Sequence, residues 1–193
     1  MTGREKLLSA ALKLFSERGY DAVGIRQIGM EAGLTNPALY QHFSSKLALG
    51  EAVYLQSYEQ LLQEIDLETQ NADSPWDHLD GYIRAAVRLH DLDPSPLLFI
   101  EDHQRLFGPK VRELFNERAV SIRLHTWIEE GQRLGQIRSD IPAAFLVGLT
   151  IGQITQWAVM ADLGLSPRHN ADLAMSALIH AALKPQTETE TLP

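Results

Sequence analysis

Side chains that could contact DNA are concentrated in residues 25–46, IRQIGMEAGLTNPALYQHFSSK. Asn36 can pair with the edge of an adenine, whereas Pro37 and Ala38 offer small apolar surfaces that suit a thymine methyl group. Hydrogen-bond donors that can reach a phosphate or a base edge lie on both sides of these three residues. The complete predicted set of DNA contacts is Arg26, Gln27, Thr35, Asn36, Pro37, Ala38, Tyr40, Gln41, His42 and Lys46. Together they predict contacts to the phosphate backbone combined with readout of bases in a major groove.

Two short helices joined by a glycine-containing turn would position these side chains. Residues 25–32 have the apolar spacing of a helix, and Gly33 is placed to end it. Thr35 can cap the next helix, whose buried face carries Leu39 and Phe43. Such a turn holds two helices at a steep angle, so the second can enter a major groove by its N-terminal end. Similar helix pairs also occur in all-α proteins that do not bind DNA, so the pattern alone leaves that interpretation open.

Helical spacing of apolar residues continues through the rest of the chain, and no segment has a convincing strand pattern. Polar or proline-containing breaks, including one at Gly108 and Pro109, divide this stretch. The nine or so predicted helices cover approximately residues 4–18, 25–32, 36–43, 45–65, 76–92, 97–107, 110–134, 142–163 and 167–184. The predicted fold class is therefore all-α, with a helix-turn-helix domain in residues 1–46 and a second helical domain in residues 47–184. Residues 185–193 are polar and are predicted to form a disordered tail.

The charge distribution is compatible with a DNA-binding head on an acidic body. The chain of 193 residues has a formal net charge of −8, but residues 1–50 hold six basic and four acidic side chains. Only the local surface must meet phosphate, so an acidic remainder does not exclude a nucleic-acid partner. The chain has no cysteine, which excludes disulfides, a thiol nucleophile and Cys-ligated metal sites. We see no signal-peptide pattern and no apolar run of membrane-spanning length, so we expect a cytoplasmic protein.

The segment AGLTNPALYQHFSSK resembles the N-terminal domain of the TetR/AcrR family of transcriptional regulators. The resemblance covers about the first 50 residues. The matching positions are Phe15, Gly19, Ile25, Ile28, Ala32, Gly33, Leu34, Thr35, Leu39, Tyr40, His42, Phe43 and Lys46. Two positions depart from the family pattern, because Gly24 stands where a Thr or Ser usually caps the helix and Gly29 stands where Ala is usual. Gly24 has no capping side chain, which puts its phosphate contact in question, and Gly29 costs about 1 kcal/mol of helix propensity.

The resemblance implies a ligand-responsive DNA-binding transcriptional regulator, here a repressor that a small, largely apolar molecule releases from a palindromic operator. It implies a homodimer in which each subunit places its recognition helix in a major groove of double-stranded DNA. Residues 47–184 would then form the ligand-binding and dimerisation domain. An effector bound between helices 45–65 and 110–134 would move the first of them and change the spacing of the two recognition helices. No cofactor and no metal are expected, and the protein is not expected to be an enzyme.

Small residues on the last two predicted helices support a dimer interface independently of the resemblance. Helices with small residues can approach closely, and two such helices from each subunit can form a four-helix bundle. The predicted interface residues are Gly148, Gly152, Thr155, Ala174, Leu178 and Ala181. The same pattern is compatible with packing inside one subunit, and that alternative stays open.

Aromatic and apolar residues on separate predicted helices are candidates for an effector pocket, which is typically apolar with a few polar anchors. The candidates are Tyr58, Leu62, Tyr82, Phe99, His103, Phe107, Trp127 and Trp157. Each of them could equally be an ordinary core residue. Glu101 and His103 could be considered as a metal pair, but residues two apart point to different faces of a helix.

Two other functions remain open at this point. An enzyme on an all-α scaffold has little support, because the chain has no G-x-S-x-G, no H-E-x-x-H and no glycine-rich phosphate loop. The second alternative is a small-molecule-binding helical protein with a degenerate DNA-binding head, for which Gly24 and Gly29 are the best arguments. Loss of sequence preference on Asn36→Ala would exclude a degenerate head.

Overall fold

The computed structural model describes residues 1–186, and this part of the chain is built from helices without a strand. The α-helices are α1 (Gly3–Arg18), α2 (Ile25–Glu31), α3 (Asn36–His42), α4 (Lys46–Thr69), α5 (Pro75–Leu92), α6 (Ser95–Phe115), α7 (Val120–Arg133), α8 (Ala143–Asp162) and α9 (Ala171–Leu183), and a 3-10 turn, η1 (Asn116–Arg118), precedes α7. The predicted all-α class and helix-turn-helix head are confirmed. The predicted disordered tail falls largely on residues 187–193, which lie outside the described residues.

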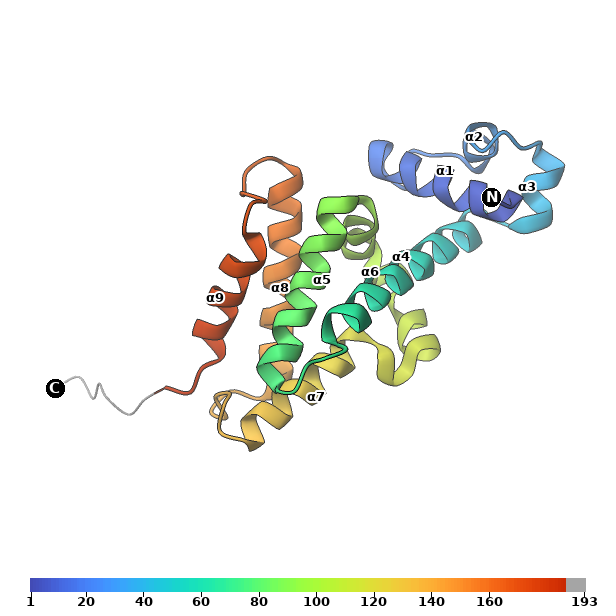
Figure 1. Ribbon diagram of the computed structural model, residues 1–193. Helices are drawn as coiled ribbons and strands as arrows, with labels where there is room; N and C mark the ends of the chain where they lie inside the picture. The colour runs from blue at the N-terminus through green and yellow to red at the C-terminus, as the bar shows by residue number, and fades with distance from the viewer. Residues whose placement is uncertain (187–193) are drawn as a thin grey trace.

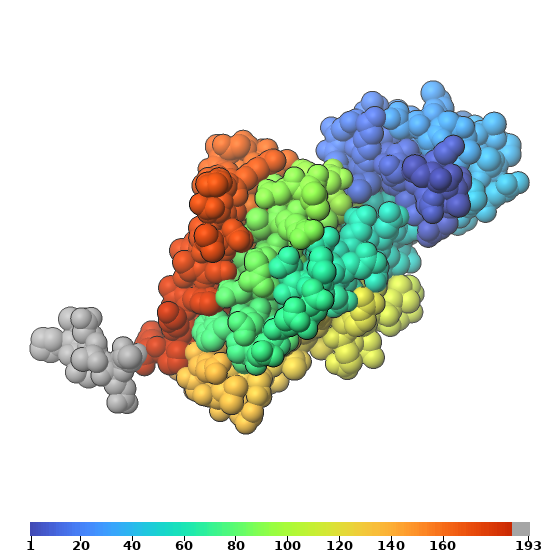
Figure 2. Space-filling view, in the orientation of Figure 1, coloured from blue at the N-terminus to red at the C-terminus, as the bar shows by residue number. Residues whose placement is uncertain are grey.

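The first three helices form a head at one end of the molecule, and α4 runs from this head into the body (Figure 1). In the body, α4 packs against α5 and α6, and α7 and α8 pack against each other. The pair α8 and α9 forms the flank of the body away from the head (Figure 2). Because α1 also packs on α4 and α6, the head is attached to the body by more than the covalent link.

Hydroxyl side chains start several helices as the sequence indicates. Thr2 and Glu5 form a reciprocal capping box on α1, in which each side chain accepts a hydrogen bond from the other residue's backbone N–H. The hydroxyls of Thr35, Ser45 and Ser74 accept from backbone N–H groups in the first turns of α3, α4 and α5. These bonds satisfy donors that have no partner within the helix, so local chemistry fixes where these helices begin.

The predicted helix break at Gly108 and Pro109 is wrong. Helix α6 continues through both residues to Phe115, and the chain breaks at η1 instead, so the predicted helix 110–134 is divided. A proline inside a helix removes one hydrogen bond, and here the buried Phe107 and Val111 on either side of it hold the helix in the core. The break occurs at Asn116, whose φ of 45° is one that asparagine tolerates better than most residues.

Candidate DNA-binding surface and effector cavity

The α2–turn–α3 unit presents the N-terminal end of α3 to solvent. Gly33 has a φ of 67°, which lets the chain turn sharply between the two helices. Ile28 on α2 and Leu39 on α3 are fully buried, and Phe43 follows them into the core. The opposite face of α3 is therefore the exposed one, and Asn36 lies on it at the first turn.

The ten residues predicted to contact DNA lie together on this unit and at the start of α4. All of them are exposed except Ala38 and Lys46, which are half-buried. The Nζ of Lys46 donates to the carbonyl oxygen of Asp21 at 3.3 Å and lies 4.3 Å from the centroid of the Tyr20 ring. To bind a phosphate, Lys46 would therefore have to donate from another of its N–H groups, or its side chain would have to move slightly.

Gln27 has a structural role that the sequence reasoning missed. Its Oε1 accepts a hydrogen bond of 2.7 Å from the backbone N–H of Gly24, so it closes the N-terminus of α2 from within the helix. This bond provides the carboxamide half of a capping box, while the hydroxyl half is missing because residue 24 is glycine. The Gln27 amide nitrogen stays available for a phosphate or a base, and the spacing of three residues is the signal that could have indicated the cap.

Gly29 allows α2 and α3 to approach closely. A Cβ added at this residue would lie 2.9 Å from Cδ1 of Leu39, closer than carbon atoms pack. Glycine lowers the helix propensity of α2 at this residue, but it also leaves room for the fully buried Leu39 side chain to pack closely. An alanine at this position would require the buried Leu39 side chain to shift.

A cavity of about 190 Å³ lies in the body between α4, α5, α6, α7 and α8. Its lining is mostly apolar with several hydroxyl groups, and comprises Tyr54, Tyr58, Leu61, Tyr82, Leu97, Ile100, Glu101, Gln104, Gly108, Val111, Val120, Ser121, Ile151 and Thr155. Of the predicted effector contacts, only Tyr58 and Tyr82 line it. Thr155, predicted for the dimer interface, lines it as well. The sequence reasoning missed Tyr54 and the role of Glu101, since nothing in a linear pattern shows which helix faces converge.

The remaining predicted effector contacts do not reach this cavity. Phe99, His103 and Phe107 belong to an aromatic cluster at the junction of head and body, where Phe15 stacks on Phe99 at 5.6 Å and Tyr20 meets His103 edge-on at 5.3 Å between ring centroids. This cluster holds α1 against α6. Phe107 also packs against Tyr54 with ring centroids 5.6 Å apart, so the cluster backs the cavity wall without lining the cavity.

The other three predicted contacts are scattered in the body. Leu62 is a fully buried core residue, and Trp127 packs against His78. Trp157 packs against the fully buried His90 and donates its indole N–H to the carbonyl of Pro167 at 3.3 Å. Within residues 1–186 no cluster of His, Asp and Glu has the arrangement of a metal site, so the pairing of Glu101 with His103 finds no support there.

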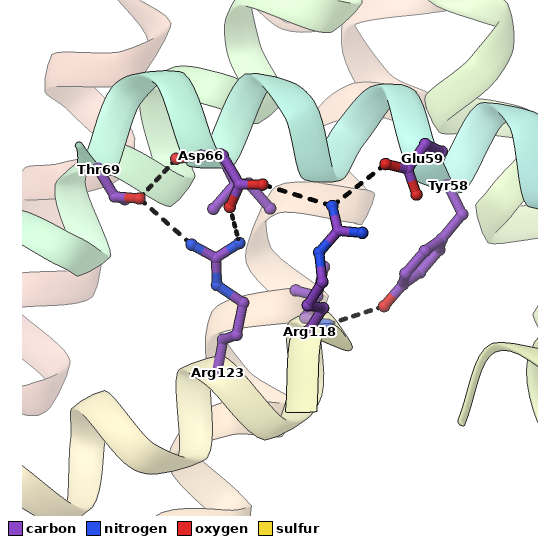
Figure 3. Close-up of polar contacts among 8 residues, drawn as sticks. Tyr58, Glu59, Asp66, Thr69, Arg118 and Arg123 are labelled. Carbon is purple, nitrogen blue, oxygen red and sulfur yellow. Dashed lines mark hydrogen bonds and ion pairs between the residues drawn. The ribbon is translucent and has the colours of Figure 1, made fainter. Parts of the chain in front are cut away.

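Two arginines hold η1 and the start of α7 against α4 (Figure 3). The guanidinium of Arg118 donates to Glu59 at 3.1 Å and to Asp66 at 3.4 Å. The guanidinium of Arg123 donates to Asp66 at 2.6 Å and to the hydroxyl of Thr69 at 3.2 Å. Because Asp66 accepts from both arginines, these two arginines and two carboxylates form one network rather than isolated pairs.

Tyr58 completes this contact on the cavity side. Its hydroxyl oxygen accepts a hydrogen bond of 2.8 Å from the backbone N–H of Val120, the first residue of α7 (Figure 3). No side chain of residues 116–119 caps α7, so the tyrosine of α4 satisfies a donor at the end of a helix 62 residues away in sequence. The wall of the cavity is thereby fastened to α4.

The ionisable groups of the cavity are one carboxyl and three phenols. Burial raises the pKa of Tyr54 and Tyr82 well above the ordinary value, so both phenols stay neutral at physiological pH. Burial, with the Asp102 charge beside it, also raises the pKa of Glu101, although the Thr155 hydroxyl partly offsets the shift. Glu101 is therefore the group that decides the charge of the cavity.

Comparison with known proteins identifies the family. Residues 7–53 match the sequence model of the family described as bacterial regulatory proteins, tetR family. A bacterial regulatory protein of the tetR family from Rhodococcus RHA1 has the same fold, with a TM-score of 0.81 at 16% identity over 97% of this chain and 100% of that one. Residues 7–53 therefore belong to the TetR family, and the described chain has the fold of solved TetR-family structures.

The relatives to which this chain is similar are transcription regulators rather than enzymes. The transcriptional activator FasR of Mycolicibacterium smegmatis is 34% identical over 102 residues, which cover 52% of this chain and 47% of FasR, so the chain spans less than half of that protein's length. The transcriptional repressor KstR2 of the same organism is 26% identical over 141 residues, which cover 72% of this chain and 69% of KstR2. A solved structure of the ketosteroid regulator KstR2 of Mycobacterium tuberculosis has a TM-score of 0.74 at 18% identity, over 96% of each chain.

In the C-terminal part of the described chain, α8 and α9 leave an apolar face uncovered. By length and composition α8 could cross a membrane, as core helices of soluble proteins also can, and 39% of its apolar window is buried. Of the predicted interface residues, Thr155 is half-buried and the others are exposed. The large apolar side chains exposed on α8 and α9 are Phe145, Leu173 and Leu178. An exposed apolar patch on two adjacent helices is typical of a protein–protein contact.

Proposed function

We propose that this protein is a ligand-responsive, DNA-binding transcriptional repressor that acts as a homodimer on a palindromic operator. The observation that carries the proposal is the exposed, polar N-terminal end of α3 on a head that α4 joins directly to the cavity. Residues 1–46 are then the DNA-binding domain, and residues 47–184 bind the effector and dimerise. A regulator of this kind works in the cytoplasm, where the operator lies.

The proposed DNA contacts divide into two classes. Asn36, Pro37 and Ala38 at the first turn of α3 face the base edges of the major groove. Arg26 on α2 and Lys46 at the start of α4 bind phosphates and set the register. Two copies of α3 must lie about 34–36 Å apart, or a multiple of this, to enter successive grooves on one face of the duplex.

The proposed dimer uses the apolar face of α8 and α9. Gly148 and Gly152 have no heavy atom within 4 Å of an added Cβ, so they border open space on this subunit. Small residues at these positions would let a partner helix approach closely, while Phe145 and Leu178 would supply apolar area that is exposed in one subunit alone. Four helices, two from each subunit, would then form a bundle.

The proposed switch acts through α4. Tyr54, Tyr58 and Leu61 of this helix line the cavity, and the same helix begins at Lys46 beside the head. An effector that fits the cavity better when α4 is displaced would move the two heads apart, because a ligand shifts an equilibrium only through its different affinity for the two states. Operator and effector would then weaken each other's binding by the same factor.

Fluorescence anisotropy with the promoter DNA that flanks the gene tests the proposal. We expect sequence-selective binding that weakens steeply with salt. Lys46→Ala should weaken binding to all sequences alike and reduce the salt dependence, whereas Asn36→Ala should lower the discrimination between bases by about 1–3 kcal/mol. Arg133→Ala, at the end of α7, is the matched control for a lost positive charge and should have no effect.

Absence of any salt-sensitive and sequence-selective binding would refute the DNA-binding proposal. In that case the small-molecule-binding protein with a degenerate head would become the better description. Equal effector affinity with and without operator would leave DNA binding intact but would exclude the switch.

A further inference from the structure

The cavity between α4, α5, α6, α7 and α8 holds one carboxyl group that has no basic partner in its walls. Among the lining residues within the described chain there is no Lys, Arg or His, and Glu101 makes no ion pair there. Arg123 influences the pKa of Tyr58, but its guanidinium pairs with Asp66 and does not line the cavity. Glu101 is half-buried, and withdrawing a carboxylate from water without a counter-ion is unfavourable, so the cavity favours a ligand that supplies one.

Three aromatic rings line the same cavity as this carboxyl group. Tyr54 and Tyr58 of α4 stack with their ring centroids 6.4 Å apart, and Tyr82 of α5 lines the cavity with them. Glu101 is close enough to both Tyr54 and Tyr82 for its negative charge to raise their pKa values. Rings of this kind attract a cation through the negative face of the π-system, most strongly where water is excluded.

From this juxtaposition we infer that the effector is a small organic ammonium ion, with Glu101 as its counter-ion and the tyrosine rings as its walls. The inference rests on the proposed function, because it names the class of ligand that would act on α4. Leu61, Leu97 and Val111 provide an apolar wall for the body of such a ligand. The hydroxyls of Ser121 and Thr155 and the amide of Gln104 offer hydrogen-bond partners for its N–H groups.

The volume restricts the ligand to about one ring with a short side group. The cavity measures about 190 Å³, below the range of roughly 300–1,000 Å³ that is usual for drug-sized ligands. An engineered apolar cavity of about 150 Å³ accommodates benzene. A single aromatic ring with an aminomethyl group therefore matches the available space, whereas a fused multi-ring molecule does not.

The same residues exclude anionic ligands. A carboxylate or phosphate in the cavity would lie beside Glu101 without a basic group to neutralise either charge. A neutral ligand can still contact the tyrosine hydroxyls and the apolar wall, but it cannot form an ion pair with Glu101. The cavity should therefore discriminate among molecules of equal size by charge alone, in the order cation, neutral molecule, anion.

Isothermal titration calorimetry on the full chain without DNA tests the inference with benzylamine, benzyl alcohol and benzoate as probes. We expect benzylamine to bind at least about tenfold more tightly than benzyl alcohol, because a hydrogen bond to a charged group is stronger than a neutral one, and benzoate not to bind. Glu101→Gln should reduce benzylamine affinity by about tenfold or more and leave benzyl alcohol affinity unchanged. Asp102→Asn, which removes the same charge from an exposed neighbour outside the cavity lining, should weaken neither affinity, because losing the Asp102 charge lowers the pKa of Glu101 and favours its charged form.

Three results would overturn the inference: equal affinities for benzylamine and benzyl alcohol, preference for benzoate, or benzylamine binding that survives Glu101→Gln. Circular dichroism on the variant confirms that it is folded, so lost affinity is not mistaken for lost structure. Because this titration contains no DNA, its failure leaves the proposed operator binding intact. Conversely, a chain that binds benzylamine through Glu101 but no operator would refute the proposed function alone.

Discussion

Replacing Tyr58 with phenylalanine should destabilise the protein by removing one long-range hydrogen bond. The substitution keeps the ring and deletes only the oxygen that accepts 2.8 Å from the Val120 N–H. Val120 is 5% exposed and is the first residue of a helix without a side-chain cap, so its N–H is left with little access to water. An unsatisfied buried donor costs about 1–3 kcal/mol. The cavity beside Tyr58 can admit a water molecule in place of the hydroxyl, so we expect the lower part of this range, about 1–2 kcal/mol.

For a chain of this length, each kcal/mol corresponds to about 2–4 °C in the melting temperature. The expected fall is therefore about 2–8 °C by differential scanning calorimetry, together with a lower urea midpoint and an unchanged denaturant slope. Protein concentration must be the same in every scan, because a dimer melts at a temperature that depends on concentration.

Tyr54→Phe is the matched control for this experiment. Tyr54 lies one turn earlier on α4 and is as buried as Tyr58, but within the described chain its hydroxyl makes no hydrogen bond that lowers its pKa. Loss of the Tyr54 hydroxyl should change the free energy of unfolding by less than about 0.5 kcal/mol. If Tyr58→Phe is as stable as the wild type, or if both variants lose the same stability, the hydrogen bond to Val120 does not fasten α7 as we argue.

Three further predictions address other parts of the molecule. Glu101→Gln should raise the melting temperature at pH 7. Because the pKa of Glu101 is higher in the folded than in the unfolded protein, ionising this carboxyl group lowers the free energy of unfolding. The folded state is therefore most stable below the unfolded pKa of the carboxyl group and loses that stability as the pH rises through its folded pKa. The gain should vanish in scans below the unfolded pKa, and a gain that persists there would contradict this origin. Leu178→Arg should convert the proposed dimer to a helical monomer by size-exclusion chromatography with light scattering, because it places a charge on the exposed apolar face; an unchanged dimer would exclude this face. Gly29→Ala should not give the gain of about 1 kcal/mol that helix propensity alone predicts, because the added Cβ would lie 2.9 Å from Leu39 Cδ1; the full gain in urea denaturation would show that Leu39 adjusts freely.

The head could be predicted closely because its signals are local. The capping hydroxyls of Thr35 and Ser45, the left-handed Gly33 and the inward Leu39 all act within a few residues of their own position. The exposure of Asn36 on α3 follows from the same helical spacing. Local hydrogen bonds and periodic burial are readable from sequence because both partners lie within one or two turns.

The break after α6 shows where local signals mislead. Gly108 and Pro109 are strong helix breakers by propensity, yet α6 passes through them because buried side chains on either side hold it in the core. The α7 helix begins where Tyr58, from a distant helix, satisfies its first N–H. Propensity is a weak prior that tertiary packing overrides.

The amino-acid sequence by itself determined the helical class, the helix-turn-helix unit and the exposed face of α3 on which Asn36 lies. Only the tertiary structure decided which side chains line the cavity in the body: it kept Phe99, His103 and Phe107 out of the lining to which Tyr58 and Tyr82 belong, and it placed Glu101 in the same cavity as the tyrosines. The physical reason is how far apart in the sequence the interacting residues lie. A helix cap or an exposed helix face depends on neighbours in sequence, whereas the cavity depends on how five helices pack, and no single helix carries that information.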